Sequence, residues 1–147
     1  MYTRILITLE NSRTDEAIIA HATALARHCK ASVLLIHVAD GFVARNIEQL
    51  DLRESEEIRK DRQYLDDVAA RIAADGIAVD AVLAIGDPAR EILAAAERER
   101  CDLIAMGTHG HRFVKDLVLG SVANEVRHVA MVPVLLLRTR RDAHTPT

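Results

Sequence analysis

The chain has 147 residues, of which half are hydrophobic and 28% are charged, and its formal net charge is −3. This length and composition suit one folded domain with a hydrophobic core rather than a disordered segment. The slightly acidic balance, the 3% of aromatic residues and the lack of a long apolar run argue against a nucleic-acid partner and against a membrane span.

Five short apolar runs are expected to form strands. Several have apolar residues in succession, which is typical of a parallel sheet covered on both faces. The runs are 4–9, 32–38, 79–85, 102–106 and 132–138. Helical spacing separates them, at Ile18, Ala22, Leu25 and Cys29, at Leu65, Val68, Ala69 and Ile72, at Ala89, Ile92, Leu93 and Ala96, and at Val122, Val126 and Val129. The order predicts an α/β domain with a single open, doubly wound, five-stranded parallel sheet and helices on both faces.

Local signals mark the expected helix boundaries. Ser12 with Asp15 resembles a capping box, Asp75-Gly76 is typical of a helix end, and Asp87-Pro88 places an N-cap before a first-turn proline.

Two segments fall outside this compact pattern. Residues 40–62 are long for a connection and rich in charge, which favours a surface loop leading into a solvated helix; a mobile flap or a partner-binding surface is the alternative. The end of the chain is polar, so we expect one domain over residues 1–139 and a polar tail over 140–147.

The stretch "GTHGHRFVKDLVLGS" (107–121) holds half of the six glycines in the chain. It lies between an expected strand and an expected helix, and we expect its loop to start at Gly107. The unpaired amides of a helix beginning at Gly120-Ser121 would attract an anion, and we expect this anion to be phosphate. The alternative is that these are ordinary turn glycines. The Walker pattern and the dinucleotide fingerprint are both absent.

The spacing G-x2-G-x9-G-[ST], met by Gly107, Gly110, Gly120 and Ser121, resembles the ATP-binding motif of the universal stress protein family. Four further stretches, "RILITLENS", "LLIHV", "GDPAREIL" and "VPVLLL", are similar to family landmarks in the same order. The resemblance covers nearly the whole chain. It implies a Rossmann-like, adenine nucleotide alpha hydrolase-like fold.

The resemblance also implies a set of ATP-binding residues. Phosphates would be held by Gly107, Gly110, Gly120, Ser121 and Val122, the adenine would be flanked by Val38 and Met106, and Thr8, Leu9 and Glu10 would lie near the base and ribose. Glu10 stands where the family usually has aspartate. Asn11 replaces a glycine, and asparagine tolerates the left-handed conformation better than most residues.

The histidines divide into two groups. His109 and His111 lie inside the expected phosphate loop, where they could donate to phosphate oxygens together with Arg112 and Lys115, or could face solvent. The others that we considered are interpreted as packed or surface residues rather than as metal ligands: His21, His28, His37 and His128. The metal ligands are not identifiable.

The resemblance implies a regulatory ATP-binding protein of stress adaptation, in which nucleotide occupancy modulates the contacts of a homodimer or of a protein partner. The dimer would form through 132–138, and ATP, or AMP or ADP in its place, would bind with Mg²⁺. A slow ATPase or autophosphorylating protein, and a nucleotide-free anion or protein interaction module, are the alternatives. No acid–base pair or activated Ser121 is evident, so dedicated catalysis is not expected. The first residues lack the features of a signal peptide, and Cys29 and Cys101 are interpreted as reduced thiols, which together indicate a cytoplasmic protein.

Overall fold

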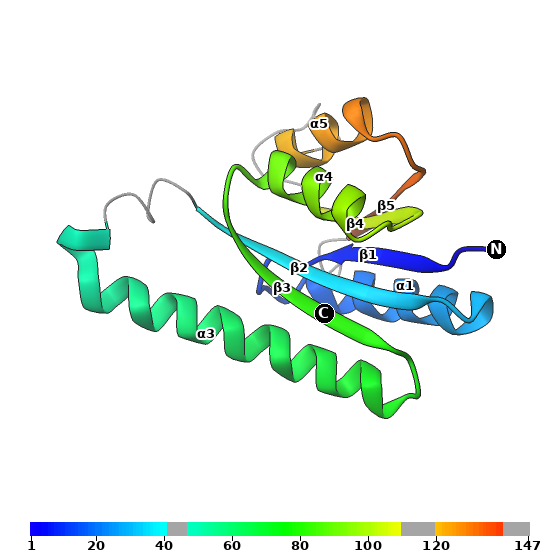
Figure 1. Ribbon diagram of the computed structural model, residues 1–147, viewed down its shortest axis with the longest axis horizontal. Helices are drawn as coiled ribbons and strands as arrows, with labels where there is room; N and C mark the ends of the chain where they lie inside the picture. The colour runs from blue at the N-terminus through cyan, green and yellow to red at the C-terminus, as the bar shows by residue number, and fades with distance from the viewer. Residues whose placement is uncertain (41–46, 110–119, 140–147) are drawn as a thin grey trace, which may run out of the picture.

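The computed structural model describes the backbone of residues 1–40, 47–109 and 120–139, with the side chains of 1–39, 56–108 and 120–138. The described strands are β1 (Arg4–Thr8), β2 (Ser32–Asp40), β3 (Val79–Gly86), β4 (Leu103–His109) and β5 (Val134–Thr139). The described helices are α1 (Asp15–Cys29), α3 (Ile47–Ala74), α4 (Pro88–Arg98) and α5 (Ser121–Val129). All strand pairs are parallel, in the order β3-β2-β1-β4-β5 (Figure 1). The predicted doubly wound α/β fold is confirmed.

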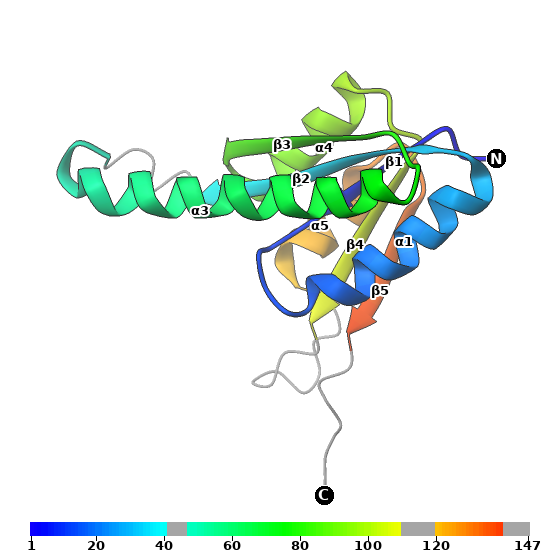
Figure 2. The ribbon, with the colours of Figure 1, turned by 90° about the horizontal axis from the view of Figure 1, so that it is seen from below.

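Helices cover both faces of the sheet, with α1 and α3 on one side and α4 and α5 on the other (Figures 1 and 2). Two hydrophobic cores result, and successive residues of a strand contribute to opposite cores. In β1, Ile5 and Ile7 pack in the core with α1 and α3, and Leu6 packs in the core with α4 and α5. This two-sided burial is the reason that the strand sequences are apolar on consecutive residues.

The fourth strand is longer than the sequence pattern predicts. It ends at His109 rather than at 106, because Gly107, Thr108 and His109 pair in register with Leu137, Arg138 and Thr139 of β5. The expectation that the glycine loop starts at Gly107 is therefore wrong. Gly107 is a strand residue.

Several predicted helix boundaries are confirmed. Asp87 caps α4 by accepting a hydrogen bond from the Arg90 amide at 3.0 Å, with Pro88 as the first helical residue. Gly76, just beyond the end of α3, has a φ of 86°, the left-handed conformation expected after a helix. The last apolar stripe is only partly correct: Val126 is buried, but Val129 is 53% exposed, and Ala123 takes part in the core instead.

Helix α3 accounts for most of the unusual 40–62 segment. Its 28 residues span about 42 Å at the usual rise of an α-helix. Leu65, Val68 and Ile72 pack it against the sheet, whereas its first part extends past the ends of β2 and β3 (Figures 1 and 2). The predicted charged helix is thus present. The connection over 41–46 and the tail over 140–147 lie outside the described residues.

Two further expectations concern helices and thiols. None of the helices in the described ranges is both long enough and apolar enough to cross a membrane. Cys29 is half-buried, Cys101 is buried, and both are free thiols as expected. Burial raises the pKa of the Cys101 thiol to about 11.

The start of β1 is fixed to the start of β4 by the carboxylate of Asp102. This group accepts hydrogen bonds from the Thr3 and Arg4 amides, at 2.9 and 3.1 Å, and from the Thr3 hydroxyl at 3.0 Å. Burial alone would raise the pKa of Asp102, but the hydrogen bonds from Thr3 and Arg4 outweigh it and lower the pKa. The contact therefore depends on the charged form of the carboxyl group.

Replacing Asp102 by asparagine should reduce the free energy of unfolding at pH 7 by about 1–2 kcal/mol, because an amide group would face backbone donors. Folding lowers the pKa of Asp102. The contribution of this carboxylate to stability is therefore fully present above the pKa of about 3.9 that it has in the unfolded chain, and it is lost as the pH falls through the lower pKa of the folded protein. Urea denaturation at pH 7 and at acidic pH should show the gap between wild type and Asp102→Asn narrowing on acidification. A gap that stays constant, or one equal to that of the exposed control Asp66→Asn, would contradict this.

Candidate functional site

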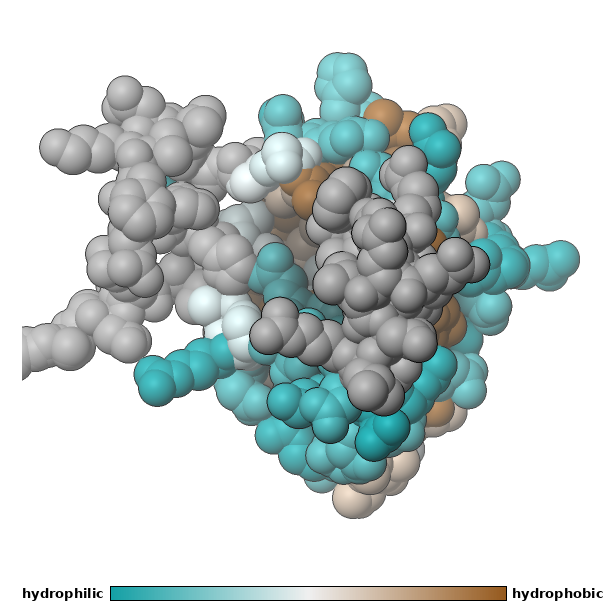
Figure 3. Space-filling model, turned by 90° about the vertical axis from the view of Figure 1, so that its left-hand side faces the viewer, coloured by the Kyte–Doolittle hydropathy of each residue, from teal (hydrophilic) through white to brown (hydrophobic). Residues whose placement is uncertain are grey.

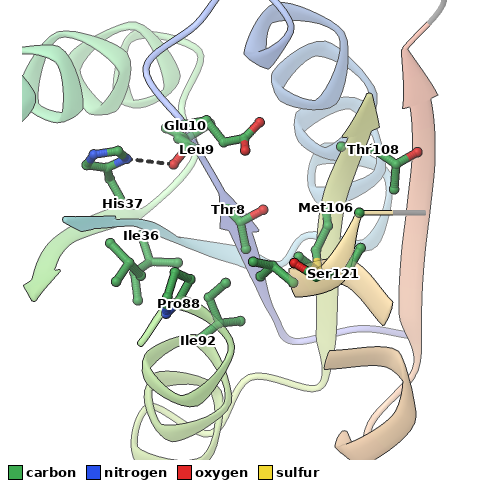
Figure 4. A pocket seen from close by; sticks show the side chains of 15 residues that line it. Thr8, Leu9, Glu10, Ile36, His37, Pro88, Ile92, Met106, Thr108 and Ser121 are labelled. Atoms are coloured by element: carbon green, nitrogen blue, oxygen red, sulfur yellow. Dashed lines mark hydrogen bonds between the residues drawn. The ribbon is translucent and has the colours of Figure 1, made fainter. Parts of the chain in front are cut away.

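A cavity of about 470 Å³ opens at the carboxyl ends of the central strands, where the strand order reverses between β1 and β4. In open α/β sheets this reversal is the usual position of a ligand. The lining residues come from β1 and the turn after it, β2, the start of α4, β4 and the start of α5 (Figure 4): Thr8, Leu9, Glu10, Ile36, His37, Val38, Pro88, Ile92, Met106, Gly107, Thr108, Gly120, Ser121, Val122 and Ala123.

Much of the cavity wall is apolar. Ile36 and Met106 are buried strand residues whose side chains belong to the core with α4 and α5, and Val38 packs against the same core. Pro88 and Ile92 close the wall from α4. In Figure 3, which looks at the side of the molecule on which β1 and β2 end, hydrophobic side chains are visible in a recess among hydrophilic ones. Such a surface suits the flat apolar face of an organic ligand.

Another part of the cavity is formed by the beginning of α5. Gly120 is the N-cap, with φ −69° and ψ 163°, and no side chain caps the helix. The first amides of a helix lack intrahelical acceptors and carry a partial positive charge. A Cβ added at Gly120 would meet no atom of the described residues within 4 Å. The packing of the described residues therefore does not require a glycine here.

A buried carboxylate organises the turn after β1. Asp15 is 3% exposed, and it accepts hydrogen bonds from three successive amides: Glu10 at 3.0 Å, Asn11 at 2.8 Å and Ser12 at 3.3 Å. The turn places Asn11 in the left-handed conformation, with φ 61°, as its residue type suggested. Successive amides arranged in this way form a binding site for an anion, and here the protein supplies that anion itself.

The predicted capping box at Ser12 is wrong in detail. Thr14 is the N-cap of α1, without a side-chain capping bond, and the Ser12 hydroxyl contacts the Thr14 hydroxyl at 2.6 Å instead. Asp15 does bind back to the Ser12 amide, but at 3.3 Å this is the longest of its amide contacts. The shorter hydrogen bonds to Asp15 come from the Glu10 and Asn11 amides, which lie earlier in the turn that surrounds the carboxylate.

The peptide group between Leu9 and Glu10 is held at both ends. Its N–H donates to Asp15, and its carbonyl oxygen accepts a hydrogen bond from His37 Nδ1 at 2.9 Å (Figure 4). The Nε2 atom of His37 lies 3.2 Å from Asp61 Oδ2 on α3. The other oxygen of Asp61 accepts from the Asn11 side chain at 2.9 Å. The turn that forms one wall of the cavity is thus fixed from α1, β2 and α3.

Tyr64 adds a second link between α3 and this turn. Its hydroxyl donates to Asp15 Oδ2 at 2.6 Å. Burial, followed by the hydrogen bond and the negative charge of Asp15, raises the pKa of Tyr64 well above its ordinary value. The hydroxyl consequently stays protonated and remains a donor across the physiological range.

Most of the residues proposed from sequence line this single cavity: Thr8, Leu9, Glu10, Val38, Met106, Gly107, Gly120, Ser121 and Val122. The side chain of His109 and all of Gly110 lie outside the described residues, as do His111, Arg112 and Lys115. His21, His28 and His128 are exposed. No group of three or more possible metal ligands occurs in the described part of the chain.

Sequence reasoning missed six lining residues: Ile36, His37, Pro88, Ile92, Thr108 and Ala123. The Asp87-Pro88 signal could have found two of them, because a helix that starts directly after a parallel strand begins at the same edge of the sheet as the ligand. His37 was interpreted as a packed or surface residue. No local pattern announces its contact with Leu9, which is 28 residues away along the chain.

Replacing Tyr64 by phenylalanine should lower the free energy of unfolding by about 1–2 kcal/mol, because the buried carboxylate of Asp15 would lose a donor. Chemical denaturation measures the change. Tyr2→Phe is the matched control, since Tyr2 is a half-buried tyrosine packed against the same core. Loss of the Tyr2 hydroxyl should lower the free energy of unfolding by no more than about 0.5 kcal/mol. Equal losses in the two variants would contradict the role assigned to Tyr64.

Comparison with known proteins identifies the family to which the chain belongs. The model of the universal stress protein family matches residues 1–138. A universal stress protein of Thermus aquaticus is 36% identical over 143 residues, covering 94% of this chain and all of that protein. The solved structure of the protein MJ0577, a universal stress protein of Methanocaldococcus jannaschii, superimposes with a TM-score of 0.82 at 27% identity, covering 97% of this chain and 99% of that one. The chain belongs to the universal stress protein family.

Proposed function

We propose that this chain binds an adenine nucleotide in the cavity at the β1–β4 reversal. The phosphates would lie before the first turn of α5, near Gly120, Ser121 and Val122, and the adenine would lie between Val38 and Met106. The observation that carries the proposal is the combination, in one cavity, of an apolar wall with the open amino end of a helix. A nucleotide has the same two parts, a flat apolar base and an anionic phosphate chain.

The size of the cavity supports a ligand of this class. Its volume of about 470 Å³ lies within the range of roughly 300–1,000 Å³ that is usual for small-molecule sites. Two solved universal stress proteins are complexes, one with cAMP and one, from Archaeoglobus fulgidus, with dAMP. At 18% and 23% identity these two share the fold with this chain. The ligand class proposed for this chain rests on its own cavity.

We further propose ATP as the physiological ligand, with AMP or ADP as the alternatives and with Mg²⁺ as the counter-ion. Magnesium is commonly held by phosphate oxygens and water with few protein ligands, which fits the lack of a cluster of metal ligands in the described residues. When bound, the nucleotide would supply charge and hydrogen-bonding surface. The role assigned to this chain is binding, with no bond-breaking step.

The regulatory part of the proposal concerns the edge of the sheet at β5. In the described sheet β5 pairs only with β4, and its apolar residues Leu135, Leu136 and Leu137 are half-buried on alternating faces. An apolar edge strand with unpaired backbone groups is a liability unless something covers it. A second copy of this chain, paired through this strand, would do so, and nucleotide occupancy would modulate the contacts of that dimer in stress adaptation.

Replacing Gly120 by valine should raise the dissociation constant of ATP at least about tenfold, or abolish binding, while leaving the fold intact. The backbone angles at Gly120 suit any residue, and an added Cβ would meet no atom of the described residues within 4 Å, so the loss is expected from the clash of the valine side chain with the phosphates. Isothermal titration of ATP and thermal melting test both halves of this statement.

Ala78→Val is the matched control, because Ala78 is an exposed, non-helical residue outside the cavity and also receives a valine. Wild-type affinity in Gly120→Val, in a protein that melts normally, would contradict the placement of the phosphates. Loss of binding in the Ala78→Val control would show that the effect is not specific to the helix terminus.

Light scattering of the purified chain should give twice the mass of 16.2 kDa that one copy has. A mass of one copy at high protein concentration would count against a dimer paired through β5 and would leave the nucleotide proposal unaffected.

A further inference from the structure

The ring of His37 lies between two hydrogen-bond acceptors. Nδ1 is 2.9 Å from the Leu9 carbonyl oxygen, and Nε2 is 3.2 Å from Asp61 Oδ2. A carbonyl oxygen and an ionised carboxylate can only accept. Both ring nitrogens must therefore donate for both contacts to be favourable, and only the imidazolium form carries two N–H groups.

The neutral ring would lose one of the two contacts. If Nδ1 keeps its proton, the lone pair of Nε2 faces the Asp61 carboxylate. If Nε2 keeps it, the lone pair of Nδ1 faces the Leu9 carbonyl oxygen. The side chains of His37 and Asp61 are only 13% and 17% exposed, so water has little access to replace the missing hydrogen bond. Either tautomer disfavours the observed arrangement.

This arrangement bears directly on the cavity. The Leu9 carbonyl belongs to the peptide group whose N–H is bound by Asp15, so His37 and Asp15 together set the orientation of that peptide. Asp61 also holds the Asn11 side chain. Leu9, Glu10 and His37 all line the cavity, so a change in these bonds alters its wall.

We propose that His37 and Asp61 are a positioning pair that makes nucleotide affinity depend on pH, with the tighter-binding state being the one in which the His37 ring is doubly protonated. The inference rests on the proposed function, because it concerns the same cavity. Because only the doubly protonated ring donates to both Leu9 and Asp61, nucleotide binding would weaken when a rise in pH removes one of its protons.

Among the described residues, the other ionisable groups around the pair are Tyr64 on α3, Asp15 on α1 and Glu10 in the turn after β1. The neighbouring residue on β3, Leu83, is apolar. Tyr64 stays neutral over the physiological range because its pKa is raised.

The test compares the dissociation constant of ATP at pH 5.5 and pH 8.0 in wild type and in Asp61→Asn. An asparagine at 61 can donate to a neutral ring and so removes the preference for the imidazolium. ATP itself titrates over this range, so we compare the dissociation constant at pH 8.0 divided by that at pH 5.5. The contribution of ATP to this ratio is the same for both proteins. The ratio in wild type should be about five times that in Asp61→Asn, which corresponds to part of the free energy of one charge-assisted hydrogen bond.

Asp66→Asn is the matched control, since it makes the same change of charge at an exposed position of α3 outside the cavity. It should keep the wild-type ratio. If Asp61→Asn fails to melt as a folded protein, His37→Gln, whose amide does not titrate, should show the same flattened ratio. The ring ¹⁵N shifts of His37 in wild type should also show both nitrogens protonated at pH 5.5.

Equal ratios in wild type and in the folded variant would overturn the inference alone. A single protonated ring nitrogen at pH 5.5 would overturn it as well. Absence of ATP binding at both pH values would overturn the proposed function, and with it this inference. A change in Asp66→Asn as large as in Asp61→Asn would assign the effect to overall charge and contradict the pair.

Discussion

The buried carboxylate of Asp15 is the contact on which the wall of the cavity depends. Removing a carboxylate from water is costly unless hydrogen bonds replace the lost hydration. Here three successive backbone amides and the Tyr64 hydroxyl do so. To donate these hydrogen bonds to Asp15, the turn after β1 places Asn11 in the left-handed conformation. The same turn brings Leu9 and Glu10 to the cavity. One group thus joins α1, the turn and α3.

The topology of the sheet provides the rest of the cavity. Because the strand order reverses between β1 and β4, their carboxyl ends lie side by side without a crossing helix to fill the space beyond them. The continued pairing of β4 with β5 carries Gly107 and Thr108 to the cavity as strand residues. The start of α5 then lies at the cavity, and its amide groups can meet an anion there. The apolar wall and the helix terminus are separate consequences of the same strand reversal.

The fold could be predicted from sequence because its signals are local and repeated. Consecutive apolar residues mark strands buried on both faces, and residues such as Pro88 and Gly76 mark helix boundaries. The length of β4 could not be predicted in this way, because it is determined by pairing with β5, some 30 residues further on in the register. Val129 matched the helical spacing but lies at the end of α5, where it is 53% exposed.

The candidate site also has one part that local sequence predicts and another that it does not. The glycine spacing indicates the part of the cavity at the start of α5, where we propose that the phosphates bind, since a helix terminus is a local feature. The contacts that shape the other wall join residues far apart in the chain: His37 with Leu9, Asp61 with Asn11, and Tyr64 with Asp15. Each of these side chains is unremarkable in its own sequence context, and Asp15 was interpreted as part of a capping box. Their role emerges only when α3 is packed against the sheet.

The most direct test of the central claim is an NMR titration of the ¹⁵N-labelled protein with ATP, followed at the backbone amides. The account predicts that the largest shifts occur at Gly120, Ser121 and Val122, with further shifts at Glu10 and Met106 across the cavity. The account would be contradicted by unchanged amides at the start of α5, or by shifts confined to a different cavity, which is lined by Cys101 and Met131 among others.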